Sequence, residues 1–416
     1  MMGEKNSLEK FGILDIPKGW QIKKLKDILI EGRLGGNYEN AEANNGVPVI
    51  KMGNLDRATI KIDKIQYLPE NETYNQEDVL VKGDLLFNTR NTLELVGKVA
   101  IWNNELPFAV YNSNLMRMKF DSSFVESTWF MNRAFNSYYG LRQLRGIATG
   151  TTSVAAIYGR DLESIKFLLP PLPEQKAIAQ VLSTADSAIH TTEKLIAQKE
   201  LRKKWLMQQL LTGKKRLKGF SGEVKIKVVG QFIKEVSERN KGLKVTRVLS
   251  VTNSRGFINQ SDQFDRSVAS EDASNYKIVR KGQFAYNPSR VNVGSLDLLR
   301  NFDEGILSPM YVVFSTDEKH LLADFLYFHL KTQWFYGHIP MFVQGSVRDS
   351  LSFDGLCSMK FFIPTIEEQA AIVKVLQAAD KEISLLKAKA EKLREQKKGL
   401  MQVLLTGKVR LKINNE

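Results

Sequence analysis

Four polar loops hold the side chains of this sequence that are best suited to hydrogen-bond chemistry. Two of them, 88–91 and 149–153, lie in the first half of the chain, and two, 287–292 and 344–348, lie in the second. Asn and Gln can pair bidentately with adenine, and Arg with guanine, in a DNA major groove. Ser, Thr and backbone N–H groups suit phosphate oxygens. Any one such loop could be an ordinary solvated turn, but these loops fall at corresponding places in the two halves. The candidate contact residues are Asn88, Thr89, Arg90, Asn91, Thr151, Thr152, Asn287, Ser289, Arg290, Asn292, Gln344, Ser346 and Arg348.

No catalytic or metal-binding motif accompanies these loops. The sequence contains neither a G-x-x-x-x-G-K-[ST] phosphate loop nor a G-x-G-x-x-G motif. Its four histidines lack the spacing of a zinc site, and a single cysteine, Cys357, excludes a cysteine cluster and an internal disulfide. Asn287-Pro-Ser-Arg290 is distantly similar to the Asn-Pro-Pro-aromatic motif of amino-methyltransferases, but the second proline and the aromatic residue are missing. We therefore expect a non-catalytic chain with no metal and no cofactor of its own.

The elements that must position the loops come in two copies. Residues 169–218 align with 363–412 at a constant offset of 194 residues, and 23 of the 50 paired positions are identical. The blocks that precede these segments are related more weakly, as 82–88 and 281–287 show. A period of about half the chain indicates the duplication of a large unit and excludes a solenoid. The predicted order is a globular block at 1–168, a repeated segment at 169–218, a second block at 219–362 and a second repeated segment at 363–416.

Each repeated segment is predicted to form one long helix. Proline followed by Glu-Gln is a helix start signal, and Gly213 and Gly407 are suitable C-caps. Apolar residues recur between these ends at alternating steps of four and three over about 39 residues, the pattern of a coiled-coil seam. Thr192, Lys199, Lys203 and Lys397 interrupt the series. The alternative is two helices buried in separate domains, but a narrow apolar stripe needs a partner and the other copy supplies one. The predicted seam residues are Ile178, Leu182, Ile189, Ile196, Leu206, Leu210, Ile372, Leu376, Ile383, Leu393, Leu400 and Leu404.

The two globular blocks are predicted to be α+β, with mixed helices and strands. The whole fold would be two such domains separated by two long helices, which pair as an antiparallel coiled coil in a pseudo-twofold internal repeat. Such a twofold would hold the blocks at opposite ends of the helices. The expected strands are 47–51, 59–63, 84–87 and 96–101, and the expected helices are 123–145 and 320–337.

The formal net charge of +14 lies mainly in the predicted helices. Residues 169–218 hold 10 basic and 4 acidic residues, and 363–412 hold 11 and 6, so these segments contribute +6 and +5. A basic chain suits a polyanionic partner such as nucleic acid. No apolar run approaches the ~20 residues that span a bilayer, and the N-terminus lacks an apolar signal core. We therefore expect a cytoplasmic protein with no membrane partner.

The repeated motifs resemble those of the specificity subunits of type I restriction–modification systems. The resemblance covers essentially the whole length in order. The second copy departs from it modestly, since Thr365-Ile366-Glu367 replaces Pro171-Leu172-Pro173. The segments that show the resemblance are Pro170-Pro-Leu-Pro-Glu-Gln175, Lys204-Trp-Leu-Met-Gln-Gln-Leu-Leu-Thr-Gly-Lys214, Glu368-Gln369, Lys398-Gly-Leu-Met-Gln-Val-Leu-Leu-Thr-Gly-Lys408 and Gly83-Asp-Leu-Leu-Phe-Asn-Thr-Arg90.

This resemblance implies two target-recognition domains, each of which reads one half of a split, asymmetric site in double-stranded DNA. It implies that the paired helices fix the spacer and dock two modification (methyltransferase) subunits, which use S-adenosylmethionine. Restriction (translocase/nuclease) subunits, which use ATP and Mg²⁺, would join that assembly. Two alternatives stay open: a non-catalytic coiled-coil scaffold that bridges two protein-binding domains, and a methyltransferase or nuclease that acts alone.

Overall fold

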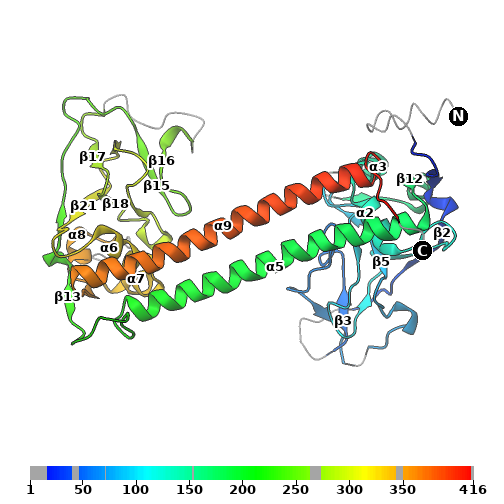
Figure 1. Cartoon of the computed structure of the whole chain (residues 1–416), viewed down its shortest axis with the longest axis horizontal. Helices are drawn as coiled ribbons and strands as arrows, with labels where there is room; N and C mark the ends of the chain where they lie inside the picture. The colour runs from blue at the N-terminus through cyan, green and yellow to red at the C-terminus, as the bar shows by residue number, and fades with distance from the viewer. Residues whose placement is uncertain are drawn as a thin grey trace. The chain divides into compact units, whose positions relative to one another are not determined.

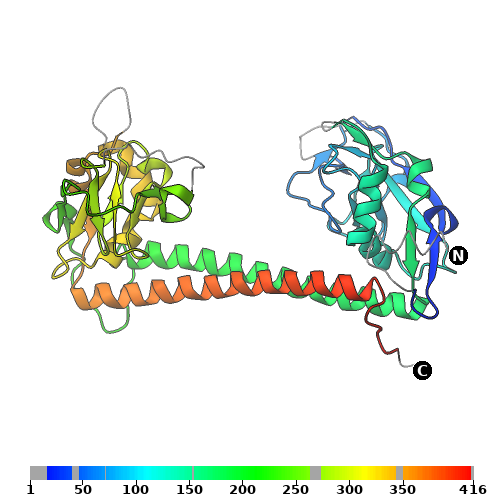
Figure 2. The same ribbon diagram turned by 90° about the horizontal axis from the view of Figure 1, so that it is seen from above.

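The computed structural model describes residues 16–39, 46–70, 72–151, 154–262, 273–342 and 350–413. The chain forms two compact units. Unit 1 comprises 1–192 and 389–416, and unit 2 comprises 193–388. The borders between the units cut through both long helices, α5 (Leu172–Leu210) and α9 (Ile366–Leu404). Each unit therefore contains one globular block and a stretch of each helix, and α5 and α9 run side by side (Figures 1 and 2).

Unit 1 is built on a four-stranded antiparallel sheet. Its strands are β2 (Leu29–Leu34), β9 (Leu115–Phe120), β5 (Leu85–Asn88) and β7 (Val99–Ile101), in that order. A separate pair joins β1 (Gln21–Lys24) to β12 (Lys166–Leu169), the strand that leads into α5. Two three-stranded sheets complete the unit. One has the order β4 (Gln66–Tyr67), β3 (Pro48–Ile50), β8 (Val110–Tyr111), and the other has the order β10 (Thr149–Gly150), β11 (Ala155–Ala156), β6 (Arg90–Asn91).

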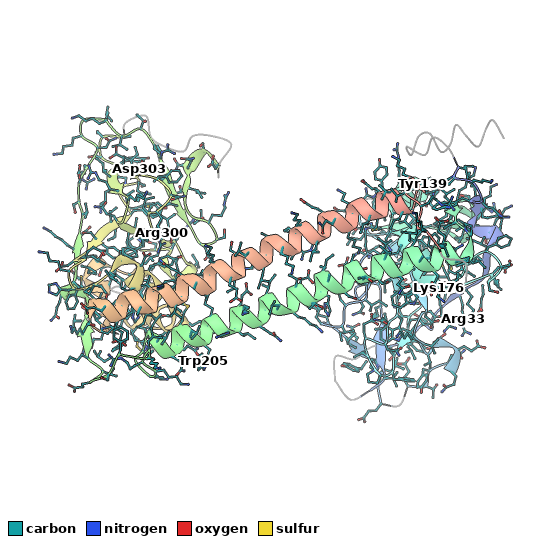
Figure 3. The ribbon with its side chains drawn as sticks, viewed as in Figure 1. Arg33, Tyr139, Lys176, Trp205, Arg300 and Asp303 are labelled. Atoms are coloured by element: carbon teal, nitrogen blue, oxygen red, sulfur yellow. The ribbon has the colours of Figure 1, made fainter. Side chains whose placement is uncertain are left out.

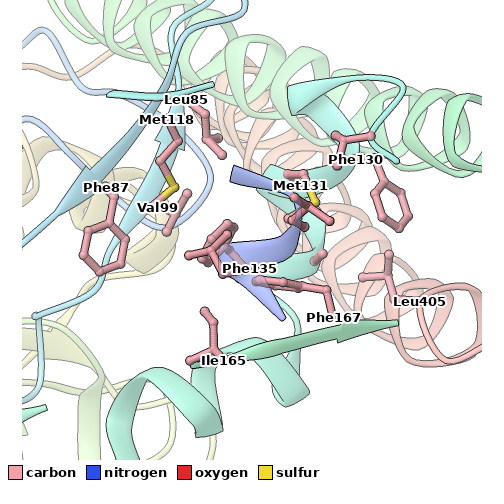
Figure 4. Close-up of a cluster of buried hydrophobic side chains, with 14 of the residues drawn as sticks. Leu85, Phe87, Val99, Met118, Phe130, Met131, Phe135, Ile165, Phe167 and Leu405 are labelled. Atoms are coloured by element: carbon pink, nitrogen blue, oxygen red, sulfur yellow. The ribbon is translucent and has the colours of Figure 1, made fainter. Parts of the chain in front are cut away.

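Short helices and the ends of α5 and α9 close the core of unit 1. The helices of the block are α2 (Thr128–Phe135), α3 (Tyr138–Ile147) and α4 (Gly159–Glu163). Figure 4 shows Phe135 between Phe87 of the sheet and Phe167 of β12, with Leu405 nearby. The Phe135 and Phe167 rings meet edge to face with centroids 4.6 Å apart, a geometry that adds to simple burial.

Unit 2 repeats this plan. Its four-stranded sheet has the order β14 (Ile233–Glu235), β21 (Val312–Thr316), β18 (Phe284–Tyr286), β19 (Leu296–Leu298), the same succession of first, last, second and third strand. β13 (Ile226–Val228) pairs with β22 (Lys360–Phe362), which leads into α9. The remaining elements are the hairpin β15 (Leu249–Thr252) and β16 (Gly256–Asn259), the pair β17 (Lys277–Arg280) and β20 (Glu304–Leu307), and the helices α6 (Ala323–Leu330), α7 (Gln333–His338) and α8 (Phe353–Cys357).

Several expectations for the blocks are confirmed and three are wrong. Strands form within 47–51, 84–87 and 96–101, but 59–63 makes only an isolated bridge from Ile60 to Leu55. The two predicted helices are each broken in two, because a side-chain cap starts a second helix inside the range. Ser137 accepts the Gly140 N–H, and Thr332 accepts the Phe335 N–H, which is the N-cap role these residues favour.

Both long helices end as predicted. α5 and α9 have 39 residues each, and Gly213 and Gly407 adopt φ values of 69° and 68°. These left-handed values suit glycine. They let the Lys215 and Val409 N–H groups reach back over six residues to the Gln209 and Val403 carbonyls at 3.1 Å, which satisfies a carbonyl in the last turn of each helix.

None of the twelve predicted seam residues is exposed. The seam is deepest where the helix ends join the block cores, and its middle section belongs to neither core. Seven positions are buried and five are half-buried. The buried ones are Ile178, Leu182, Leu210, Ile372, Leu376, Ile383 and Leu404, and the half-buried ones are Ile189, Ile196, Leu206, Leu393 and Leu400.

Each lysine that interrupts the seam meets a carboxylate of the other helix. In unit 2, Lys199 pairs with Glu382 at 2.5 Å and Lys203 pairs with Asp380. In unit 1, Lys397 pairs with Asp186 at 2.5 Å. Rising numbers on one helix meet falling numbers on the other, so the helices are antiparallel within unit 2, as predicted.

The contacts themselves obey the 194-residue repeat. Lys203–Asp380 in unit 2 becomes Lys397–Asp186 in unit 1. Likewise Arg216 binds the buried carboxylate of Glu368 in unit 2, and Arg410 binds that of Glu174 in unit 1. Two residues and their two repeat mates thus exchange roles, as they do across a twofold interface. This reciprocity confirms the internal repeat in three dimensions.

The glutamine of each Glu-Gln motif anchors its helix to its own block. The Gln175 amide donates to the carbonyls of Phe124 and Pro170 at 2.7 and 2.9 Å and accepts from the Glu126 N–H. Gln369 makes the same three bonds in unit 2, with His320, Pro364 and Leu322. Both side chains are fully buried. The Glu-Gln motif that identifies the repeat therefore connects each long helix to its block through buried hydrogen bonds.

Candidate nucleic-acid interface

The two predicted contact loops of unit 1 meet in one small sheet. β11 pairs with β6 on one side and with β10 on the other, so Arg90 and Thr149 both lie opposite Ala156. Residues in one such column share a face, and two strands at about 4.8 Å spacing put them roughly 10 Å apart. Arg90 is exposed and makes no ion pair among the described residues. The fold thus brings 88–91 and 149–151 together across some sixty residues of chain.

Not every residue of these loops is available for contact. Asn88 is fully buried, and its Oδ1 accepts the Arg90 N–H at 3.2 Å. The Thr89 hydroxyl donates to the Asn114 carbonyl at 3.0 Å. Asn91 is half-buried and its Oδ1 accepts the Thr92 N–H. These side chains shape the loop around Arg90, and the predicted contact residue Asn88 lies buried beneath it.

Thr151 is exposed at the tip of the β10–β11 turn. Its hydroxyl accepts the Val154 N–H at 3.2 Å. Thr152 lies outside the residues that the structure describes, as do Gln344, Ser346 and Arg348 of the fourth predicted loop.

The third predicted loop follows β18 in unit 2. The Asn287 Oδ1 accepts the Ser289 N–H at 3.1 Å, and the Asn287 carbonyl accepts the Arg290 N–H at 3.0 Å, which closes a tight turn. Ser289, Arg290 and Asn292 are exposed, and Asn287 is half-buried. The Arg290 guanidinium makes no ion pair with any described residue. The second unit therefore also presents one unpaired arginine on a loop after the second strand of its main sheet.

Some other arginines of the two blocks are engaged. Figure 3 labels two of them. Arg33 pairs with Asp78 at 3.1 Å. Arg300 pairs with Asp324 at 2.5 Å and lies over the Tyr327 ring at 4.1 Å. Such pairing lowers the charge that a side chain can offer to a ligand, whereas Arg90 and Arg290 form no ion pair with the residues that the structure describes.

Unit 2 also contains a cleft beside this loop that the sequence does not reveal. It has a volume of about 380 Å³ and lies between the β15–β16 hairpin, the 287–293 loop and 308–311. Its walls include Thr252, Asn253, Asn287, Arg290, Met310 and Tyr311. The residues come from four distant stretches, so no local pattern could have indicated the cleft.

Sequence reasoning also missed a pair of cations in unit 1. Burial lowers the pKa of the Arg57 guanidinium, and the positive charge of Arg145 lowers it further. The Arg57 Nη2 donates to the Glu94 carbonyl at 3.4 Å. Two like charges held close together favour an anion beside them. The two arginines are far apart in sequence, and only the fold reveals their proximity.

Comparison with known proteins assigns the chain to a family. The family profile described as the type I restriction modification DNA specificity domain matches residues 17–201 and 298–395, together more than half of the chain. The chain belongs to the type I restriction–modification DNA specificity family. The two matched stretches cover most of unit 1 and the later part of unit 2, together with most of both long helices.

Relatives within this specificity family match along nearly the whole chain. The putative type I restriction enzyme MjaX specificity subunit of Methanocaldococcus jannaschii is 27% identical, with 98% of each chain covered. The MjaVIII specificity subunit of the same organism is 25% identical over 98% of this chain and 97% of its own. The EcoKI specificity subunit of Escherichia coli K12 is 26% identical over 50% of this chain and 44% of its own.

Solved structures of this family share the fold. The type I restriction–modification S subunit from M. genitalium superposes with a TM-score of 0.58 at 14% identity, covering 96% of this chain and 98% of that chain. A chain from a structure of type I restriction–modification complex assembly gives a TM-score of 0.57 at 15% identity, covering 95% and 100%. The predicted α+β blocks and paired long helices are thus the architecture of the specificity family. No helix within the described ranges is long and apolar enough to cross a membrane.

Proposed function

We propose that this chain is the DNA-recognition subunit of a type I restriction–modification complex in the cytoplasm. Each unit binds one half of a bipartite, asymmetric target in double-stranded DNA. The paired helices set the spacer between the half-sites and dock two methyltransferase subunits, and restriction subunits join that assembly. The chain itself performs no chemistry. S-adenosylmethionine, ATP and Mg²⁺ belong to the partner subunits.

One observation carries this proposal: the two units share their framework contacts and differ in what they present. The Glu174–Arg410 and Glu368–Arg216 pairs are equivalent across the repeat. The surfaces around Arg90 and Arg290 are not, since a three-stranded sheet surrounds the first and a cleft adjoins the second. A shared framework suits identical partner subunits, and unlike reading surfaces suit an asymmetric target.

Selection from a random duplex library tests this proposal. The chain is assembled with its methyltransferase subunits, and the bound DNA is sequenced. We expect two short defined sequences, different from each other, around an undefined spacer of fixed length. Affinity for this DNA should fall linearly on a log–log plot as salt rises. A palindromic or contiguous site would contradict the two-reader arrangement, and the absence of any selected sequence would favour a protein scaffold.

The absence of chemistry in this chain is tested separately. The chain alone is incubated with target duplex and S-adenosylmethionine, and in parallel with Mg²⁺ and ATP. We expect neither methylated nor cleaved DNA until the partner subunits are added. Turnover by the isolated chain, lost in a variant of this chain, would overturn the assignment of the chemistry to the partners.

A further inference from the structure

The cleft of unit 2 has the dimensions and lining of a site for a single nucleotide. A major groove alone is about 12 Å wide, so a double helix cannot enter a volume of about 380 Å³. A planar ring of nucleobase size can. The cleft therefore calls for an occupant smaller than the duplex that the unit as a whole would bind.

The charge of the lining limits the chemistry of that occupant. Of the fifteen described residues that line the cleft, Arg290 alone is charged. It is exposed and unpaired among the described residues, so its guanidinium is free to bind an anion such as a phosphate. A ligand with a neutral body and one negative group matches this lining, and a nucleotide has that distribution.

The neutral part of the lining suits the edge and the face of a base. Asn253, Gln260 and Asn287 supply carboxamides, which can pair with the hydrogen-bonding edge of a base. Tyr311 and Met310 supply the flat and polarisable surface on which a ring can rest.

The fold holds one of these amides before any ligand arrives and leaves room for another. A Cβ atom on Gly294 would come within 2.4 Å of the Asn253 Oδ1, so the glycine leaves space for that amide. The Asn287 Oδ1 is held by the Ser289 N–H at 3.1 Å. Groups that are already positioned lose little conformational entropy on binding.

We propose that this cleft takes one nucleotide of the second half-site after that nucleotide has turned out of the duplex. Its base lies among the carboxamides and Tyr311, and Arg290 binds its phosphate. The proposal rests on the proposed function and adds a mode of reading in which one base is recognised outside the stack. A free nucleotide shares this chemistry, and the experiment below separates the two sources.

A mismatch scan tests the extrusion. The chain, assembled with its methyltransferase subunits, binds the selected target duplex. Each base of one strand of the second half-site is kept while its partner is replaced by a mismatched base, and then the strands are exchanged. Extrusion is easier when the pair is already broken. We therefore expect binding to tighten by about tenfold at one position and to weaken or stay unchanged at the others.

Three variants of exposed residues connect the tightening to the cleft. Arg290→Ala removes the guanidinium that would bind the phosphate. Val293→Trp places an indole at the rim of the cleft, where Val293 is 59% exposed. Both should abolish the gain from the mismatch. Arg255→Ala, in the exposed β15–β16 turn outside the cleft, should retain it.

The possible outcomes separate this inference from the proposed function. Specific binding with no tightening at any position overturns the extruded nucleotide, as does tightening that survives Val293→Trp. A free nucleotide is tested by adding millimolar deoxynucleoside monophosphates to the same complex without DNA. If they bind, if Val293→Trp abolishes that binding, and if no mismatch tightens binding of the duplex, then the cleft serves a free nucleotide and the extrusion is wrong. If no sequence-specific binding is found at all, it is the proposed function that fails.

Discussion

In the 88–91 loop, one residue supports the backbone and a nearby residue is exposed. Asn88 is buried and accepts the backbone N–H of Arg90, while the Arg90 side chain is exposed. A buried amide that holds a neighbour's backbone fixes where the next side chain begins. Asn287 holds Ser289 in the same way at the matching place in unit 2. The asparagine that recurs in both loops is thus explained by the turn it closes.

Arg90→Ala and Arg290→Ala should each impair one half-site. If the Arg90 guanidinium binds a guanine bidentately, its loss costs about 1–3 kcal/mol of discrimination at one base pair. Arg290→Ala should relax one position of the second half-site, because it releases the nucleotide proposed to lie in the cleft. Selection from a random library should then show one position relaxed in one half-site and the other half-site unchanged. Equal weakening on all sequences, with a smaller salt dependence, would instead identify phosphate contacts.

His329 makes the stability of unit 2 sensitive to mild acid. Burial lowers its pKa to about 3, and the side chain is 5% exposed in contact with the rings of Phe325 and Phe361. The unfolded chain takes up a proton below its ordinary value of about 6.5, whereas the folded chain does not. The stabilisation that depends on neutral His329 is therefore complete above pH 6.5 and is lost as the pH falls toward 3.

Chemical denaturation between pH 6.5 and 5.5 measures this effect. The free energy of unfolding of unit 2 should fall by about 1.4 kcal/mol per pH unit once the unfolded histidine is protonated. Carboxylates remain ionised over most of this window and contribute little. A His329→Leu variant should lose most of the slope. The same slope in the variant would show that another group is responsible.

At the scale of elements, the seam of α5 and α9 combines apolar packing with ion pairs at its interruptions. Lys203 and Lys397 are repeat mates, and each meets an aspartate of the opposite helix. Their surroundings differ in one respect. Arg133, which is 4% exposed, also pairs with Asp186 at 2.5 Å in unit 1, whereas the Phe328 ring lies 5.6 Å from Lys203 in unit 2.

A charge exchange should therefore be tolerated in unit 2 and not in unit 1. Lys203→Glu alone should cost about 1 kcal/mol, and adding Asp380→Lys should restore most of it, because the pair is remade with reversed signs. In unit 1, Lys397→Glu with Asp186→Lys leaves the buried Arg133 beside a lysine, so no recovery is expected. Thermal unfolding of these three variants and of the single Lys397→Glu variant decides this, and equal recovery in both units would contradict the role given to Arg133.

The helix pair should act as a ruler if it sets the spacer. Removing one heptad from the middle of each helix shortens both by about 10.5 Å at 1.5 Å per residue. We expect the selected spacer to shorten by about 3 base pairs at 3.4 Å per pair. Removing seven residues between 263 and 272, outside both helix ranges, provides a control in which the helix lengths are unchanged. A spacer that does not change on helix shortening would refute the ruler.

The helices could be predicted from the sequence much better than the blocks, for a physical reason. Their ends, length and seam follow from local signals: prolines and Glu-Gln at the start, Gly213 or Gly407 at the end, and a regular apolar period between. In the blocks, burial depends on distant neighbours. The breaks at Ser137 and Thr332, the burial of Asn88 and the proximity of Arg57 to Arg145 all depend on where other strands lie, and no local pattern indicates them.

At the scale of the whole molecule, the structure refines the meaning of the basic charge. Of the net charge of +14, +11 lies in the two repeated segments. Part of that charge is internal to the framework, since Lys199, Lys203, Lys397, Arg216 and Arg410 all pair with carboxylates. The blocks are close to neutral. We therefore expect recognition by the blocks to depend on a few placed donors rather than on bulk attraction.

Arg410 and Arg216 should be matched determinants of stability for the two units. Arg410 binds Glu174, which is 1% exposed, at 2.6 and 2.7 Å and also donates to the Lys18 carbonyl. Arg410→Ala leaves the buried Glu174 carboxylate with Trp20 as its one remaining hydrogen-bond partner among the described residues, and we expect unit 1 to lose about 2 kcal/mol. Arg216→Ala should do the same to unit 2. Hydrogen exchange resolved along the chain measures both, and a loss spread equally over both units would contradict their independence.

Unit 1 is assembled from the two ends of the chain, whereas unit 2 is one continuous stretch, 193–388. This difference sets an order during synthesis. Unit 2 can complete its core as soon as its last helix turns leave the ribosome. The first block emerges earlier but must wait for Leu404, Leu405 and Arg410 to fill its core and neutralise Glu174. The part of the protein that is made first is therefore the part that finishes folding last, and a nascent chain that stops early leaves the first reader incomplete.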